Sequence, residues 1–276
     1  PEGGHLMVMH FPRMVVAELQ AVFGRWSGRA ALILALLIPF AAAGAKIGLE
    51  SQATEASFNG MPIQQMLDLS AVGVLDWSLT ARNAFLLPAL LVLATAASVS
   101  GELRDNTLRA VLSRPVSRAS VLLAKLAALS VLSLSTLGLS FLPGLIAGVS
   151  LYGMPEDATF GAIGLGFAAS WLSDLGLVAM TLLISVFLRN VGGVVVLLIL
   201  YLMIDKAVGL MLTGLGVLGV EGVATMQAYL PGNALACWEG WNAADGWDAS
   251  QFGGLALLFL LTLGISIIRF QRMDVP

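Results

Sequence analysis

The sequence has few of the side chains that carry enzyme chemistry. It contains two histidines, His5 and His10, both near its beginning, and a single cysteine, Cys237. A Ser-His-Asp or Cys-His catalytic site in the apolar part of the chain would therefore have no histidine to use. The ligands are too few for a histidine–cysteine zinc cluster, and one cysteine cannot form an intrachain disulfide.

Charged residues are also scarce. They make up 11% of the 276 residues, whereas soluble domains carry roughly 25%. Hydrophobic residues make up 58%, which is more apolar surface than one globule can remove from water. The main solvent of this chain must be lipid, which excludes a disordered chain, a nucleic-acid-binding module and a secreted disulfide scaffold.

A phosphate-binding loop is absent from the sequence. None of the three lysines, Lys46, Lys125 and Lys206, follows a glycine, so the pattern G-x-x-x-x-G-K-[ST] does not occur. We therefore expect no ATP hydrolysis through that motif, no enzyme activity and no metal site in this chain.

Six apolar runs are long enough to cross a membrane, which takes about 20 helical residues. They predict spans over about residues 30–49, 83–100, 119–151, 159–188, 191–212 and 252–269. The expected fold is an all-α polytopic membrane protein, with residues 11–276 as a single transmembrane domain. The first run also resembles a cleaved signal peptide, but the amphipathic stretch before it and the five runs after it favour a permanent span.

The basic residues predict the orientation. Eleven of the 14 lysines and arginines fall on one side of the predicted spans. These are Arg13, Arg25, Arg29, Arg104, Arg109, Arg114, Arg118, Lys125, Arg189, Arg269 and Arg272. By the positive-inside rule this side is cytoplasmic, and both termini lie there.

The stretch before the first span predicts an amphipathic helix over residues 11–27, lying in the membrane interface. Pro12 suits the beginning of such a helix. Residues 1–10 are expected to be a disordered remnant of the expression vector. One face is apolar at helical spacing except for Glu18. The residues expected to anchor this helix are Met14, Glu18, Leu19, Phe23 and Trp26.

The loop between the second and third spans predicts a short helix parallel to the membrane. Asp105 or Asn106 could cap its beginning near Thr107, and Pro115 would end it. Its apolar face comprises Leu108, Val111 and Leu112. Its basic rim comprises Arg104, Arg109, Arg114 and Arg118. Such an element can dock into a cleft of a soluble partner. A plain, positively charged cytoplasmic loop is the alternative.

Residues 102–125 follow the pattern E-x-x-x-x-T-L-x-x-x-L-S-x-P-V-S-R-x-x-x-L-x-x-K. The matching residues are Glu102, Thr107, Leu108, Leu112, Ser113, Pro115, Val116, Ser117, Arg118, Leu122 and Lys125. With six spans and an interfacial helix before the first, the chain resembles the membrane subunits of ABC-2 type transporters. The similarity is closest to the subgroup that includes the membrane subunit of the nitrous-oxide-reductase maturation transporter. Asn106 departs from the pattern, because the family usually has glycine there, which puts the helix cap in doubt rather than the helix.

The resemblance implies an exporter of two permeases and two ATP-binding subunits in the bacterial inner membrane. The second permease would be another copy of this chain or a homologous one. The partner subunit would bind ATP and Mg²⁺, so this chain would hold no cofactor and contact only lipids and proteins. Residues 103–114 would form the coupling helix, and substrate would pass between the permeases. The residues implied in coupling are Glu102, Leu103, Arg104, Asp105, Thr107, Leu108, Val111, Leu112 and Arg114.

Three charged residues fall inside predicted spans: Asp174, Asp205 and Lys206. An intramembrane carboxylate is costly unless it is paired or wet, so these are candidate functional residues. Counted from Arg189 and Asn190, Asp174 and Lys206 both lie about 22–24 Å from the turn at ~1.5 Å per residue. They could pair or line a wet cavity, or form a purely structural ion pair. With Asp174 as a proton or cation site, the chain could instead be an ion-driven secondary transporter.

Two outer segments and three glycine pairs complete the pattern. Apolar residues from Ile63 to Trp77 predict a short helix on the outer surface. Residues 213–250 predict one or two re-entrant or interfacial helices, and an ordinary outer loop with an aromatic belt is the equal alternative. G-x-x-x-G pairs occur at 24–28, 44–48 and 144–148, but this glycine-rich sequence is expected to contain about three by chance, so no packing site is predicted from them.

Overall fold

Long apolar runs form helices here because a backbone in lipid must bond every N–H and C=O group within its own segment. The computed structural model describes residues 3–53, 57–58, 61–62, 70–84, 86–108, 116–154, 160–218, 222–223, 226, 230–239, 241 and 249–273. Its helices are α1 (Gly3–Gly24), α2 (Trp26–Ala53), α4 (Ala71–Ala84), α5 (Leu86–Ala96), α6 (Glu102–Arg104), α8 (Arg118–Tyr152), α9 (Phe160–Phe187), α10 (Val191–Val217), α12 (Pro231–Leu235) and α13 (Ala249–Arg272). A π-helical segment, η1 (Ala97–Gly101), joins α5 to α6.

Six of these helices are long and apolar enough to cross a membrane, so the prediction of an all-α polytopic membrane protein is confirmed. Each predicted span falls on one of them. The observed helices are mostly longer than the predicted runs: α8 has 35 residues and α10 has 27. Two short antiparallel strands, β1 (Ser57–Phe58) and β2 (Met61–Pro62), form a small ladder after α2.

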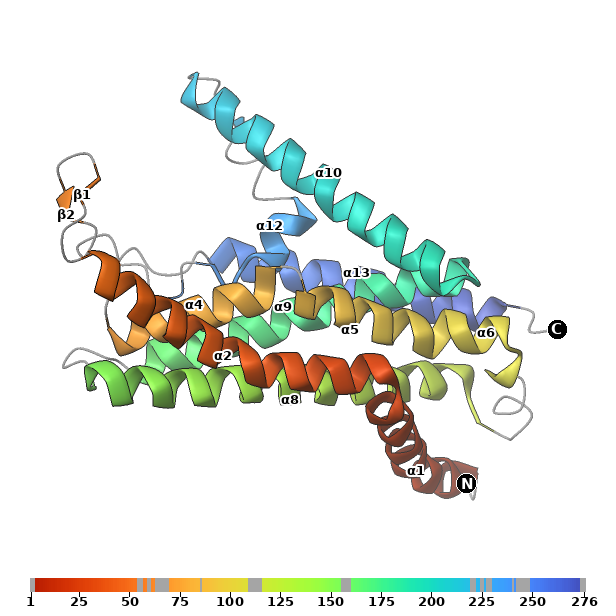
Figure 1. The fold of residues 1–276 in the computed structure, drawn as a ribbon. Coiled ribbons are helices and arrows are strands. Elements are labelled where there is room, and N and C mark those ends of the chain that lie inside the picture. Colours follow the sequence, from red (N-terminus) through yellow and green to blue (C-terminus); the bar gives the residue numbers. More distant parts are fainter. Residues whose placement is uncertain are drawn as a thin grey trace.

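The long helices run side by side, and both termini lie at the same end of the bundle (Figure 1). That end also holds α6, the beginning of α8 and the turn between α9 and α10. We call it the basic end, because it carries arginines that the sequence groups on one side. Arg118 at the beginning of α8 donates hydrogen bonds to backbone carbonyls around the end of α13, including that of Met273.

The central helix of the bundle is α8, which packs against α1, α2, α4 and α9. Two clusters of buried apolar side chains lie along it. The cluster at the basic end includes Leu103, Leu122 and Phe270, and the cluster at the opposite end includes Leu75, Phe141 and Trp241. The buried positions of α8 recur at helical spacing, which is why one face of this helix can serve several neighbours.

Two boundaries differ from the sequence prediction. The first helix begins at Gly3, not at residue 11, so residues 3–10 are helical and not disordered. Pro12 therefore lies inside α1 and does not begin it. The helix ends at Gly24, and Trp26 belongs to α2.

The prediction of a surface helix from Ile63 to Trp77 is wrong in its described part. Residues 63–69 lie outside the described residues. The remainder is α4, in which Ala71, Val74 and Leu75 are buried against α2 and α8. Periodicity alone cannot separate a helix that lies on a membrane from one that packs into a bundle, because both bury one stripe.

The helix α10 diverges from the bundle toward the end opposite the basic end (Figure 1). In the most apolar windows of α10 and α13, 17% of the residues are buried, against 61% in α8 and α9. Of the predicted re-entrant helices in residues 213–250, the described part contains α12, which contacts α9, α10 and α13. Trp241 is buried rather than interfacial, and its indole N–H donates to Asp76 at 3.0 Å.

One of the three glycine pairs is a packing site, although the motif alone did not predict which, if any, would be. A Cβ at Gly148 would lie 2.6 Å from the Ala71 carbonyl oxygen, and a Cβ at Gly144 would lie 2.9 Å from Ser78 Oγ. Both contacts are on α4, so these two glycines allow α8 and α4 to approach closely. No atom lies within 4 Å of such a Cβ at Gly44 or at Gly48 among the described residues.

Replacing Gly148 with alanine should therefore destabilise the bundle. The added methyl group meets backbone atoms that cannot move independently, and we expect a loss of about 1–3 kcal/mol in the free energy of unfolding. Gly138→Ala in the same helix is the control, because a Cβ there meets nothing within 4 Å. Unfolding in mixed micelles measures both. Equal stability of the two variants would contradict the α4–α8 contact.

Candidate functional site

Four charged side chains meet at the basic end. The Lys125 ammonium of α8 donates hydrogen bonds to Glu18 of α1 and to Glu102 of α6, with N–O distances of 2.7 Å for both. Arg25, between α1 and α2, donates to the second carboxylate oxygen of Glu102 at 2.8 Å. We call these four residues the basic-end network. It connects the amphipathic helix to the ends of the second and third spans.

The network is buried at its centre. The Lys125 side chain is 1% exposed, and the Glu18 and Glu102 side chains are 15% and 18% exposed. Removing an ammonium group from water costs several kcal/mol unless opposite charges surround it. Two carboxylates and two cations leave no net charge, so the network fixes the relative positions of three helices without a buried excess charge.

Two residues after Glu102, beyond the buried Leu103, the chain forms an exposed turn, which comprises Arg104, Asp105, Asn106 and Thr107. Arg104 Nε donates to Asp105 at 2.9 Å, and this hydrogen bond lowers the pKa of the Asp105 carboxyl group. The carboxylate is therefore charged at neutral pH. Both side chains are more than half exposed, so the turn presents a charged surface beyond the network.

Asn106 has φ 57°, the one positive φ of a non-glycine residue in the described part of the chain. Glycine adopts this left-handed conformation without strain, and asparagine tolerates it better than most residues. The position where the sequence departs from the family pattern is therefore a position where the backbone favours glycine, and asparagine preserves the turn. Helical structure resumes at Thr107 and Leu108.

The predicted coupling residues are divided between interior and surface. Leu103 and Arg104 end the helix of the second span and do not begin a separate helix. Leu108 is 1% exposed and packs with Leu103 in the apolar cluster of the basic end, so it is not a free knob. The other predicted members, Val111, Leu112 and Arg114, lie outside the described residues.

The predicted anchors of the amphipathic helix are in contact with the bundle, with one exception. Met14, Leu19 and Phe23 pack against the apolar cluster of the basic end. Glu18, the polar exception on this face, pairs with Lys125. Trp26 is 74% exposed on α2 and does not anchor α1.

A second buried cluster lies within the membrane-spanning part. Arg82 of α4 is 1% exposed, and its guanidinium donates to both carboxylate oxygens of Asp174 on α9, at 2.5 and 3.4 Å. The Ser133 hydroxyl of α8 donates to the same carboxylate at 2.5 Å, and Thr136 Oγ1 accepts from Arg82 at 3.3 Å. The pair connects α4, α8 and α9.

The predicted ion pair between Asp174 and Lys206 is wrong. Asp174 is paired with Arg82, and the Lys206 side chain is exposed on α10, with no ion pair among the described residues. Residue counting gave both groups the same distance from the α9–α10 turn, which agrees with their place on one cavity. It carries no information on the direction in which each side chain points around its helix axis.

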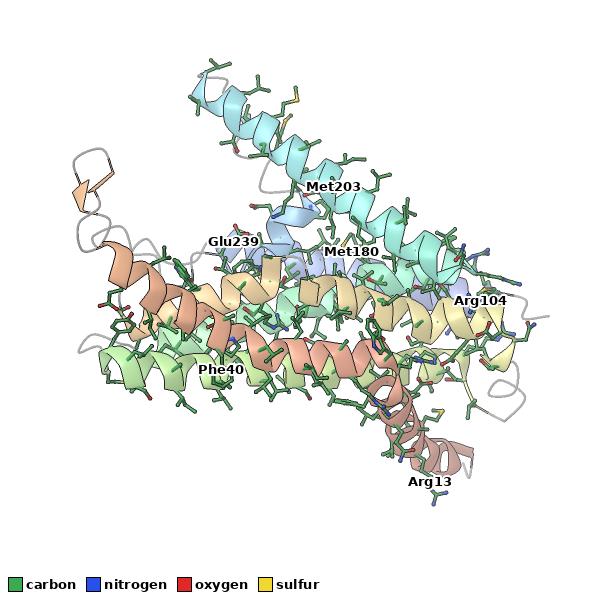
Figure 2. All side chains as sticks on the ribbon, viewed as in Figure 1. Arg13, Phe40, Arg104, Met180, Met203 and Glu239 are labelled. Carbon is green, nitrogen blue, oxygen red and sulfur yellow. The ribbon has the colours of Figure 1, made fainter. Side chains whose placement is uncertain are left out.

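The alternative, a shared cavity, agrees with the structure. A cavity of about 240 Å³ lies between α5, α9, α10 and α12, and both Asp174 and Lys206 line it. Its other lining residues include Asn83, Leu198, Met203 and Trp238. Figure 2 places Met203 on α10 and Glu239, another lining residue, close to α12. The lining is mostly apolar, and its polar members include Asn83, Ser173, Asp174, Lys206 and Glu239.

Asp205, the third predicted intramembrane group, connects α10 to α12. Its buried carboxylate accepts hydrogen bonds from the Gly232 N–H and from the Tyr201 hydroxyl. The Asp205 carboxylate occupies the space that a Cβ at residue 232 would need, so glycine is required there. Asp205 is therefore a structural contact that the sequence did not reveal.

The comparison with protein families now identifies the kind of protein. A model of the ABC-2 family of transporter proteins matches residues 20–275. The chain belongs to this family. A search of curated proteins found no match. This ABC-2 protein is a multi-pass membrane subunit of an ABC transporter, as the pattern in residues 102–125 predicted.

Sequence reasoning missed Arg82 and the joint role of Glu18, Arg25 and Lys125 in this ABC-2 protein. A signal existed for Glu18, which is the polar exception on an apolar helical face. A signal also existed for Lys125, which ends the family pattern and falls inside a span. Among the described residues no three histidine, cysteine, aspartate or glutamate side chains group as metal ligands.

Replacing Lys125 with methionine should strongly destabilise the protein, because two carboxylates would then lack their shared cation. We expect a loss of about 3–5 kcal/mol in unfolding free energy, the usual cost of removing one partner from a buried ion pair. Arg104→Ala, which disrupts an exposed pair two residues after Glu102, should leave stability unchanged. A Lys125→Met variant as stable as Arg104→Ala would disprove a structural role for the network.

A double-mutant cycle tests the intramembrane pair. Arg82→Gln and Asp174→Asn should each cost about 3–5 kcal/mol, and the double variant should cost clearly less than the sum. Lys206→Met combined with Asp174→Asn should be additive, because these groups share a cavity but no hydrogen bond. Unfolding in mixed micelles gives the coupling energies. Stronger coupling to Lys206 than to Arg82 would contradict the observed pairing.

Proposed function

We propose that this chain is the permease subunit of an ABC exporter and that a separate ATP-binding subunit drives it by docking on the exposed turn. The observation that carries this proposal is the position of the turn. It begins two residues after Glu102, whose carboxylate is bonded to Arg25 and Lys125. A force applied to the turn is therefore applied to α1, α6 and α8 together.

The surface offered to the partner is polar in its described part. Arg104, Asp105, Asn106 and Thr107 are exposed, whereas Leu103 and Leu108 are buried in the chain itself. We therefore assign partner contacts to the exposed turn and to the undescribed residues that follow it, including Val111, Leu112 and Arg114. The partner binds ATP and Mg²⁺. Nucleotide binding to one state of the complex then shifts the population of permease conformations.

Assembly with a second permease is part of the same proposal. Exposed apolar side chains on α10 include Val196, Leu200, Met203, Leu210 and Met211. Such a surface is suited to contact with lipid or with a second permease copy. The cavity is bounded on one side by α10, which supports a substrate path beside this helix.

Ion-driven secondary transport is less well supported. It would need Asp174 as an exchangeable proton or cation site. The Asp174 carboxylate instead accepts hydrogen bonds from Arg82 and from the Ser133 hydroxyl, an arrangement that favours a structural ion pair.

The proposed location is the bacterial inner membrane, with the basic end and both termini in the cytoplasm. Arg25, Arg104, Arg118 and Arg269 at one end of the bundle support this orientation through the positive-inside rule. Membership of the nitrous-oxide-reductase maturation subgroup stays a prediction.

Exchanging the charges of the exposed turn tests docking. Arg104→Asp combined with Asp105→Arg keeps an internal ion pair, so the fold should be retained. We expect the affinity for the ATP-binding subunit to fall about tenfold, because the charges that face the partner are reversed. Arg272→Asp at the end of α13 is the control for a general charge effect. Unchanged copurification and ATP turnover in the exchanged variant would refute docking at this turn.

A further inference from the structure

The π-helical segment η1 contacts the turn between α9 and α10. Its Ser100 side chain is fully buried, and the hydroxyl donates to the Leu188 carbonyl at 2.6 Å and to the Ser185 carbonyl at 3.1 Å. These carbonyls lie at the end of α9, where the last turn of a helix lacks partners of its own. Ser100 therefore caps α9 from a different helix.

The neighbouring residue contacts the beginning of α10. A Cβ added at Gly101 would lie 3.6 Å from Val191 Cγ2, an ordinary packing distance, so the Val191 side chain lies beside the Gly101 backbone. Val191 is the first residue of α10, and the Asn190 side chain caps this helix by accepting from the Gly192 N–H at 3.1 Å. The end of α9 and the beginning of α10 are thus both within reach of two adjacent residues of η1.

The next residue along the chain belongs to the basic-end network. Glu102 follows Gly101 and bonds to Arg25 and Lys125, and the exposed turn begins two residues later. Three consecutive residues, Ser100 to Glu102, therefore connect the exposed turn and its network to the α9–α10 turn. Short π-helical segments occur often at functional sites, and their extra residue allows a local change of helical register.

Helix α10, which receives this contact, has few other buried residues. The buried residues of α10 are Val194 and Leu198 near its beginning and Asp205 beside α12. Between and beyond them, Met203 and Leu210 are exposed. Because α10 supplies one wall of the cavity through Leu198 and Met203, a displacement at its beginning changes the width of the cavity.

We propose that Ser100 is a positioning residue that transmits movement of the exposed turn to α10 and so opens or closes the cavity on nucleotide binding. This inference depends on the proposed function, since the movement originates in an ATP-binding partner. It adds a specific route, in which the α9–α10 turn moves with η1 and the basic-end network relative to α4 and the body of α9, which the Arg82–Asp174 pair joins.

The test follows the accessibility of the cavity in the complex with its ATP-binding subunit. Met203→Cys introduces a reporter thiol on α10, where Met203 is exposed and lines the cavity. The native Cys237 is buried, and burial raises the pKa of its thiol to about 12, so it stays protonated and does not compete for label. The rate of modification by N-ethylmaleimide is measured with and without ATP, Mg²⁺ and orthovanadate.

Ser100→Ala should reduce the nucleotide-dependent change in the labelling rate about fivefold, as expected for the loss of one buried hydrogen bond. ATP turnover by the complex should persist and thus report that the variant folds and docks. Ser98→Ala is the matched control: Ser98 is equally buried in η1, but its hydroxyl donates to the Thr95 carbonyl of its own helix at 2.8 Å. The Ser98→Ala variant should show the same nucleotide-dependent change in labelling as the protein that carries Met203→Cys alone.

The outcomes separate this inference from the proposed function. No nucleotide effect on labelling in the Met203→Cys background would contradict the proposed function itself. A full nucleotide-dependent change in labelling in Ser100→Ala would overturn the route through Ser100 and leave the proposed function standing. An equal loss of that change in Ser98→Ala would do the same. If Ser100→Ala does not assemble, Val191→Ala tests the adjacent contact of η1 with α10, which lies between Gly101 and Val191. It should give a partial loss of response, and a full response would likewise overturn the route.

Discussion

The ammonium group of Lys125 is the constraint on which the basic end depends. It is removed from water and placed between two carboxylates from different helices, Glu18 of α1 and Glu102 of α6. A buried ammonium group is stable only while both carboxylates stay beside it, so the positions of α1, α6 and α8 are coupled. The amphipathic helix is for this reason more than a membrane anchor. It supplies a carboxylate that Lys125, near the beginning of the third span, requires.

The lipid environment explains the rest of the architecture. Helices do not need to bury their apolar faces to be stable in lipid, because the hydrocarbon is as apolar as a leucine side chain. Extensive exposure of α10 and α13 is therefore compatible with a stable fold. Close packing arises where small residues permit it, as at Gly144 and Gly148 against α4, and where buried polar groups require it, as at Arg82 and Asp174.

The sequence predicted well whatever depends on run length and residue type. Spans follow from apolar length, and the side of the basic residues follows from counting along the chain. It failed where the direction of a side chain around its helix axis decides the partner. Asp174 and Lys206 line one cavity, yet Asp174 is paired with Arg82 on α4, a residue to which the sequence pattern assigned no role.

The same limit explains the error over residues 63–77, since a stripe on a helix does not say whether lipid or protein covers it. Asn106 shows the opposite case. One departure from a family pattern correctly marked a special backbone position, because the left-handed conformation is the physical reason for glycine there. A pattern is thus most informative where a single residue type satisfies a backbone constraint, and least informative where packing of several helices decides the outcome.

The two buried ionic clusters divide the molecule into a rigid and a less constrained part. Both use α8, and Lys125 and Ser133 lie about 12 Å apart along it at ~1.5 Å per residue. Together they connect α1, α4, α6, α8 and α9, and no described side chain of α10 or α13 takes part. Local opening requires least free energy where the fewest buried contacts are lost. Conformational change in this ABC-2 protein should therefore involve α10 first, because its buried contacts are concentrated near its beginning and at Asp205.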